Sequence, residues 1–176
     1  DEADPEWLLR EDVRRGIRAV GNAGLAYNLL VRPRELPATV ELVDGMADTR
    51  FVVDHIAKPP IAAGELEPWS ERMRQLADQR AVSVKLSGMV TEADWESWSV
   101  DDLRPYIERL LEWFGPGRLM FGSDWPVCQL AAGYEQVHAA LTELLADLTE
   151  RERAQVFGGT ATTVYRLDEE VRPAAQ

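Results

Sequence analysis

The sequence is poor in the two side chains that most often build metal and redox sites. Its 176 residues include one cysteine, Cys128, and two histidines, His55 and His138. A lone cysteine excludes a disulfide within the sequence and suits a reducing compartment, so we expect a cytoplasmic protein. Cys128 itself either lines a functional site or fills the core as a small apolar side chain, which is the commoner role.

Long hydrophobic runs and an excess of basic residues are also missing. No apolar stretch approaches the roughly 20 residues of a membrane-spanning helix. The 19 lysines and arginines are outnumbered by 31 acidic residues, and the net charge is −12. A nucleic-acid surface needs clustered positive charge, so we expect neither a nucleic-acid nor a membrane partner. The first residue is Asp1 rather than Met, so we expect the beginning of a longer protein to be absent from this sequence.

The sequence does contain a regular alternation of apolar strand patterns and amphipathic helix patterns. A composition that is 45% hydrophobic and 28% charged is ordinary for a globular domain with a real core. Strands are expected at residues 25–31, 50–58, 81–88 and 118–122, and helices at 11–23, 36–47, 68–79, 101–114 and 134–145. Strands separated by helices of this length predict a parallel sheet with right-handed crossovers, an α/β fold.

The last expected strand ends on a carboxylate. Leu119, Met120 and Phe121 are consecutive apolar residues, as in a strand buried on both faces, and Asp124 follows within the motif RLMFGSDWPV. The C-terminal ends of parallel strands are where ligands bind in α/β folds. Asp124 therefore either caps a turn or takes part in chemistry, and this motif alone favours neither.

A second strand has the same construction. The segment RFVVDHIAKPP places Asp54 and His55 directly after an apolar stretch. A lone histidine is more often structural, but a histidine and an aspartate at neighbouring strand ends can share a proton or a metal ion. Together, His55 and Asp124 indicate a shared polar site.

Other polar residues interrupt the expected strands. Lys85 and Ser87 fall on one face of the strand AVSVKLSG, which either looks into a barrel or meets water at a sheet edge. Tyr27 lies in the first expected strand and faces either the barrel interior or the core. His138 lies on the apolar stripe of its helix, which favours a structural role.

Two loops are long enough to cover a site. Residues 57–67 are rich in proline, glycine and alanine, and residues 89–99 are acidic and contain tryptophan.

The motifs DHIAKP, VKLSG and RLMFGSDWPV, in this order, with LLVRP before and GGTATTVYRL after them, resemble the lactonase-like branch of the amidohydrolase superfamily. The resemblance covers nearly the whole sequence. It implies a TIM-type (β/α)8 barrel of which residues 1–176 supply about the last four strand–helix units, as the C-terminal portion of a single domain. It also implies hydrolysis of the lactone ring of a sugar lactone or related carboxylate.

The resemblance also implies roles for particular residues. Asp124 matches the aspartate of the final strand, which activates water and then protonates the leaving oxygen, and His55 matches the active-site histidine. Residues expected to contact the substrate are Lys58, Lys85, Ser87, Tyr27 and Trp125. His55 and Asp124 are also the candidate ligands for one divalent metal such as zinc, although members of this branch include enzymes that need none.

One signature of the superfamily, an HxH pair on the first strand, does not occur in this sequence. This leaves three alternatives open: a lactonase of which this is a part, a decarboxylase or amide hydrolase of the same superfamily, and an inactive half-barrel that binds or scaffolds. The two unpaired edges of a half-barrel favour association, including with a second copy of the chain.

Overall fold

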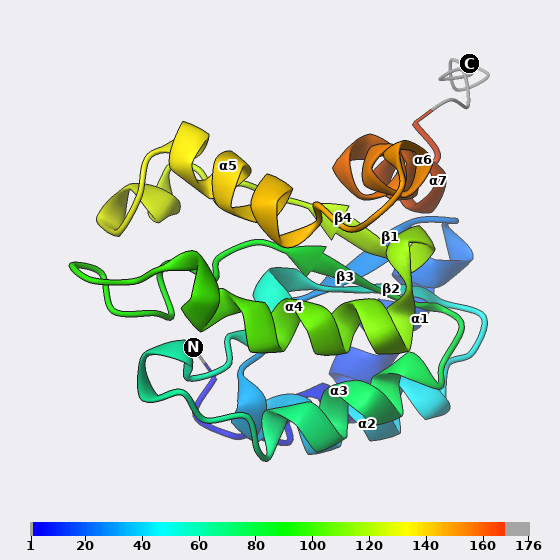
Figure 1. The fold of residues 1–176 in the computed structure, drawn as a ribbon. Helices are drawn as coiled ribbons and strands as arrows, with labels where there is room; N and C mark the ends of the chain where they lie inside the picture. The colour runs from blue at the N-terminus through cyan, green and yellow to red at the C-terminus, as the bar shows by residue number, and fades with distance from the viewer. Residues whose placement is uncertain (1, 168–176) are drawn as a thin grey trace.

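A computed structural model describes residues 2–167, and its centre is a sheet of four parallel strands (Figure 1). The strands are β1 (Ala26–Leu29), β2 (Arg50–Val53), β3 (Val82–Leu86) and β4 (Leu119–Phe121). They lie side by side in the order in which they occur in the sequence, with each pair parallel. The predicted α/β alternation with parallel strands is therefore confirmed.

Helices precede, connect and follow the strands, and several of them pack beside one another. They are α1 (Glu11–Asn22), α2 (Leu36–Asp44), α3 (Trp69–Ala77), α4 (Val100–Phe114), α5 (Tyr134–Leu144), α6 (Glu150–Ala154) and α7 (Thr160–Tyr165). Figure 1 shows α2, α3 and α4 together on one side of the sheet, while α5 and the α6–α7 segment lie beside β4. A π-helical turn, Gln155–Gly159, joins α6 to α7. No helix of the described residues is both long and apolar enough to cross a membrane.

The core lies between the sheet and the helices. Alternate strand residues such as Phe51, Val84 and Leu119 are fully buried in one cluster with Met73 of α3 and Leu110 of α4. Burial of a large apolar side chain contributes about 1.5–3 kcal/mol, so this cluster is the main source of stability. The opposite face of the sheet carries the polar Ser83 and Lys85 beside the buried apolar Val52 and Met120.

Two sequence expectations change at the strand ends. The second strand ends at Val53 rather than near Lys58, because residues 54–57 leave the extended conformation and form a tight turn. β3 lies between β2 and β4, so placing Lys85 on an edge strand is wrong. Lys85 instead lies on a central strand, next to Met120 of β4.

Candidate active site

His55 and Asp124 lie together at the C-terminal edge of the sheet. His55 follows β2 and Asp124 follows β4, and His55 Nε2 is 3.7 Å from Asp124 Oδ1. The His55 side chain is 20% exposed and that of Asp124 is 12% exposed, so both are largely shielded but reachable. The expectation that the two strands are neighbours is wrong, because β3 lies between them. The C-terminal ends of β2 and β4 nevertheless bring one histidine and one carboxylate close together.

The strand between them, β3, fixes the His55 ring. His55 Nδ1 lies 2.9 Å from Ser87 Oγ, within hydrogen-bonding distance. Gly88 comes so close that a Cβ added there would lie 2.9 Å from the His55 ring. An added Cβ at Gly122 would likewise lie 3.0 Å from Ser87 Cβ. The two glycines therefore allow Ser87 and His55 to pack against bare backbone.

The backbone that carries these side chains is strained. His55, Ile56, Ala57 and Lys58 all have positive φ, between 46° and 60°, and Asp124 has φ 58°. A non-glycine residue in this left-handed region costs roughly 1–2 kcal/mol. Such strain persists only where the surroundings enforce it, and it is concentrated at functional sites. The four consecutive strained residues therefore identify segment 55–58 as part of the candidate site.

Two ion pairs flank this strained turn. Lys85 Nζ lies 2.7 Å from Asp54 Oδ1, and Lys58 Nζ lies 2.8 Å from Glu92 Oε1. All four side chains are between 14% and 27% exposed, so water and salt screen them less than a surface pair.

The two titrating groups of the site respond to burial and to these charges. Burial lowers the pKa of His55, which the carboxylates of Asp124 and Asp54 counteract only in part. The imidazole is therefore neutral at neutral pH. Burial alone would also lower the pKa of Lys85, but the hydrogen bond and charge of Asp54 outweigh it, so the pKa of Lys85 is raised and its ammonium stays charged.

The structure gathers most of the expected site residues but not all of them. Asp124, His55 and Ser87 are in contact, while Lys58 and Lys85 reach carboxylates next to them. Trp125 follows Asp124 with its side chain 64% exposed at the same edge.

Tyr27 lies apart from this group. Its ring packs edge-on against Phe51 at 6.5 Å, on the face that joins the core. The alternative in which Tyr27 belongs to the core is the one this arrangement favours. The position was ambiguous in the sequence because β1 carries neighbouring side chains, Tyr27 and Asn28, on opposite faces.

Several residues of the site were not identified from the sequence. Glu92 is one of many acidic residues in the loop 89–99, and nothing in the sequence distinguished it. Tyr165 lies far along the chain, yet its ring covers the Lys85 ammonium at 5.8 Å and its hydroxyl donates to Asn28 Oδ1 at 3.0 Å. Only Gly88 had a local signal, because a glycine directly after a strand often marks a close approach.

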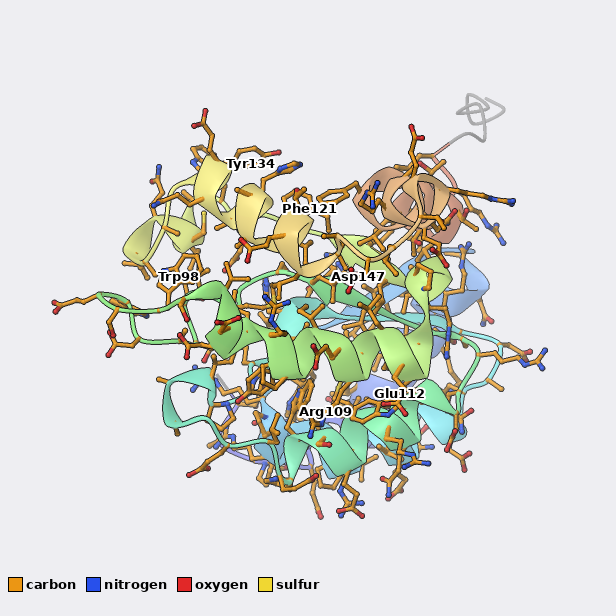
Figure 2. All side chains as sticks on the ribbon, in the orientation of Figure 1. Trp98, Arg109, Glu112, Phe121, Tyr134 and Asp147 are labelled. Carbon is orange, nitrogen blue, oxygen red and sulfur yellow. The ribbon has the colours of Figure 1, made fainter. Side chains whose placement is uncertain are left out.

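The two covering loops contact each other and the next segment. The Ala62 amide donates to the Glu92 carbonyl at 2.9 Å. Trp98 donates from Nε1 to the Ala131 carbonyl at 3.1 Å, and Figure 2 shows it between the loop before α4 and the segment before α5. The loops therefore form a connected rim along the C-terminal edge of the sheet.

His138 belongs to an aromatic cluster rather than to the site. Its ring lies 5.5 Å from that of Phe121 and 4.9 Å from that of Phe157. Phe121 and Tyr134 of this cluster are labelled in Figure 2. His138 is exposed, however, and does not belong to the buried stripe of α5, which consists of Val137, Ala140, Leu141 and Leu144.

A cavity lies next to the C-terminal end of β1. It has a volume of about 220 Å³, and its walls include Leu30, Arg32, Arg34, Glu35 and Lys58. Arg34 donates to the buried Glu35 carboxylate, so this arginine is engaged within the fold. Lys58 is the residue shared between this cavity and the strained turn.

The donor set for a metal is incomplete in the part of the chain that the structure describes. Two zinc ligands at about 2.0 Å in tetrahedral geometry lie ~3.3 Å apart, so the His55–Asp124 spacing suits two ligands of one ion. Zinc takes four, however, and residues 2–167 contain no group of three or more His, Cys, Asp or Glu side chains that could hold a metal. The described residues therefore supply His55 and Asp124 as two of the four ligands that zinc requires.

Comparison with known proteins identifies the family. The amidohydrolase family matches residues 1–167. This chain belongs to the amidohydrolase family. L-fucono-1,5-lactonases from Burkholderia ambifaria and Burkholderia multivorans are each 41% identical to it, over 96% of this chain and 59% and 61% of their own lengths.

A solved structure shows the same fold. A zinc-bound amidohydrolase from Burkholderia multivorans superposes with a TM-score of 0.88 and 36% identity, over 94% of this chain and 61% of that protein. The expected fold class, a part of an amidohydrolase TIM barrel, is thereby confirmed. The chain spans about three fifths of the length of these relatives.

Proposed function

We propose that the protein to which this amidohydrolase chain belongs hydrolyses the lactone ring of a sugar lactone or a related carboxylate. The observation that carries the proposal is the 3.7 Å approach of His55 Nε2 to Asp124 Oδ1 at the C-terminal edge of the sheet. The names of the two Burkholderia relatives support the choice of a lactone as substrate.

Asp124 is the proposed general base. A carboxylate within hydrogen-bond reach of a water molecule can accept its proton while the water oxygen attacks the lactone carbonyl carbon. Asp124 is suited to this because its side chain is 12% exposed, which leaves an oxygen reachable but shields it from bulk water. The attack forms a tetrahedral intermediate whose former carbonyl oxygen carries negative charge.

His55 is the proposed donor to that oxygen. Its lowered pKa favours the neutral imidazole. Of its two tautomers, the proposal uses the one in which Nδ1 accepts from the Ser87 hydroxyl and Nε2 carries the ring proton. A fixed N–H aimed at a developing oxyanion stabilises it more than water does, because it needs no reorientation.

The ring then opens at the bond between the carbonyl carbon and the ring oxygen. The proton that Asp124 accepted from water passes to the departing oxygen, so the products are a carboxylic acid and a hydroxyl group, and Asp124 returns to its ionised form. Trp125, exposed beside Asp124, is the proposed substrate contact. The sequence pattern also named Lys58, Lys85 and Ser87, but in the structure their polar groups already contact Glu92, Asp54 and His55.

A divalent ion such as zinc is a separate proposal for the whole protein. His55 and Asp124 would supply two of its ligands, and when bound the ion would polarise the carbonyl oxygen. Metal analysis of the purified whole protein and assay after chelation distinguish a zinc enzyme from one that needs no metal. A cytoplasmic location and association with a second copy also stay predictions, which cell fractionation and solution mass measurements would test.

Proton release tests the activity directly, because lactone opening yields an acid. The whole protein should acidify a weakly buffered solution of a six-carbon sugar lactone well above the spontaneous rate. Asp124→Asn should lower kcat by about 10²–10⁴-fold, the usual contribution of a general acid–base group. Asp147→Asn, the same change at an exposed position, is the matched control. A wild-type protein inactive on sugar lactones and on lactone dicarboxylates would overturn the proposal, as would an Asp124→Asn variant with full turnover.

A further inference from the structure

We infer that residues 85–92 form a template that holds the turn 54–58 in its strained shape, and that Lys58 and Lys85 position His55 instead of binding the substrate. The catalytic meaning of this inference rests on the proposed function, but its structural content does not. In this inference, Glu92 holds the Lys58 ammonium and Asp54 holds the Lys85 ammonium in place.

The two ion pairs have opposite polarity along the chain. At the start of the turn the acid Asp54 contacts the base Lys85 at 2.7 Å, and at its end the base Lys58 contacts the acid Glu92 at 2.8 Å. Along the chain, the turn thus has the acid Asp54 before the base Lys58, while the template has the base Lys85 before the acid Glu92. An exchange of partners would place like charges together, so the charges select one alignment of the two segments.

Between the ion pairs, the same template contacts the His55 ring. Ser87 Oγ lies 2.9 Å from His55 Nδ1, and Gly88 leaves room for the ring where a Cβ would clash at 2.9 Å. The contacts occur in the same order along both segments. The parallel pairing of β2 with β3 therefore continues beyond the strands as a series of side-chain contacts.

The strained backbone explains why a template is needed. Positive φ values at four consecutive non-glycine residues are unfavourable by themselves and require contacts that enforce them. Trp69 contributes one such contact, a 2.6 Å hydrogen bond from Nε1 to the Ile56 carbonyl. This hydrogen bond acts at the middle of the turn, and the two ion pairs hold its ends.

The two lysines are poorly disposed to bind a substrate. Each ammonium lies within 2.8 Å of a carboxylate, in a pair whose side chains are at most 27% exposed. Lys85 is also covered by the Tyr165 ring. A substrate would have to displace a shielded carboxylate, and breaking a shielded ion pair leaves an unpaired charge at high cost.

Charge reversal tests the assignment of Lys58 in the whole protein. Glu92→Gln should lower kcat about tenfold while KM stays within about twofold, because a misplaced His55 loses transition-state contacts and not substrate affinity. The double variant Lys58→Glu with Glu92→Lys should recover most of the lost kcat, as a coupled pair does. Removing the exposed Asp101–Arg104 pair of α4 with Asp101→Asn is the matched control and should leave kcat and KM unchanged.

A substrate-binding role for Lys58 gives the opposite result. Glu92→Gln would then leave kcat unchanged, Lys58→Met would raise KM, and the charge-reversed double variant would stay impaired. That outcome overturns the inference.

Amide hydrogen exchange tests the template without any assay of activity. Exchange in a peptide covering residues 54–58 should accelerate in Glu92→Gln and in Lys85→Met, while exchange in α4 stays as in the wild type. Lys85→Arg keeps the charge and should restore protection, which also covers the case in which Lys85→Met fails to fold. Unchanged exchange in residues 54–58 of Glu92→Gln would overturn the inference. A wild-type protein that hydrolyses no lactone would contradict the proposed function. The exchange measurement would still test whether residues 85–92 hold the turn 54–58.

Discussion

His55 Nδ1 lies 2.9 Å from Ser87 Oγ, and this contact decides which way the imidazole faces. With Nδ1 engaged by β3, the other ring nitrogen points to Asp124 of the strand end beyond it, 3.7 Å away. A serine hydroxyl directly after the central strand β3 therefore orients a histidine that follows β2 toward a carboxylate that follows β4. Ring orientation, rather than the presence of a histidine, makes the pair competent for acid–base chemistry.

Replacement of this serine should impair turnover moderately. Ser87→Ala removes one hydrogen bond worth about 0.5–1.5 kcal/mol, so kcat should fall about threefold to tenfold with little change in stability. Ser83→Ala is the control, because Ser83 is likewise a buried serine but lies within β3, opposite Val52 of β2. Steady-state kinetics of the whole protein decide, and equal kcat values for the two variants would contradict the orienting role.

Gly88 should tolerate no side chain. Gly88→Ala places a Cβ 2.9 Å from the His55 ring at φ +62°, which adds a clash to the left-handed strain. Gly64→Ala has a similar φ of +65° with nothing within 4 Å of the added Cβ, so it pays for strain alone. We expect Gly88→Ala to lower the free energy of unfolding by roughly 1–3 kcal/mol more than Gly64→Ala does. Urea titrations of both variants measure the difference, and equal midpoints would show that the His55 contact is unimportant.

Cys128 should be inert in the folded protein. Its side chain is fully buried, and burial, reinforced by the charge of Asp124, raises the pKa of its thiol and suppresses the reactive thiolate. Iodoacetamide should therefore label the Cys128 peptide only after denaturation, as read by peptide mass mapping. Rapid labelling of the native protein at neutral pH would place Cys128 at the surface of the site instead.

The Lys85–Asp54 pair should make stability sensitive to alkali. Because the folded-state pKa of Lys85 is raised, the pair stabilises the fold fully below the unfolded value of about 10.4 and loses this effect as pH rises through the folded value. The wild type should therefore lose more unfolding free energy than Lys85→Met between pH 9 and pH 12, roughly the range around that pKa. Denaturant titrations of both proteins across this pH range measure the difference. If the two unfolding free energies fall in parallel with pH, the pKa of Lys85 is the same in the folded and unfolded states.

The sequence predicted the scaffold well because its signals are local and repeated. Consecutive apolar residues such as Leu119, Met120 and Phe121 and the amphipathic stripe of α4 identify buried strands and the helices that cover them. The same logic located His55 and Asp124, since both follow strands whose C-terminal ends share one edge. In a parallel sheet, residues that directly follow the strands all lie at the same edge, so their place in the sequence predicts their place in the fold.

The rest of the site depends on contacts between distant residues. Glu92 meets Lys58 across 34 positions of sequence, and Tyr165 meets Asn28 across 137. No local pattern distinguishes Glu92 from its acidic neighbours. The end of β2 was also misplaced, because the left-handed turn after Val53 contains no glycine and is imposed by β3 and its loop.

The sequence by itself determined the parallel strand–helix fold, the family resemblance, and the two strand ends that carry His55 and Asp124. These features could be predicted because hydrophobic periodicity and short motifs involve residues that are close together in the sequence. Only the tertiary structure decided how His55 faces Asp124, that Lys58 and Lys85 already have carboxylate partners, and that Tyr27 joins the core. Those features follow from strained backbone and shielded charge, whose energies depend on which residues the fold brings together.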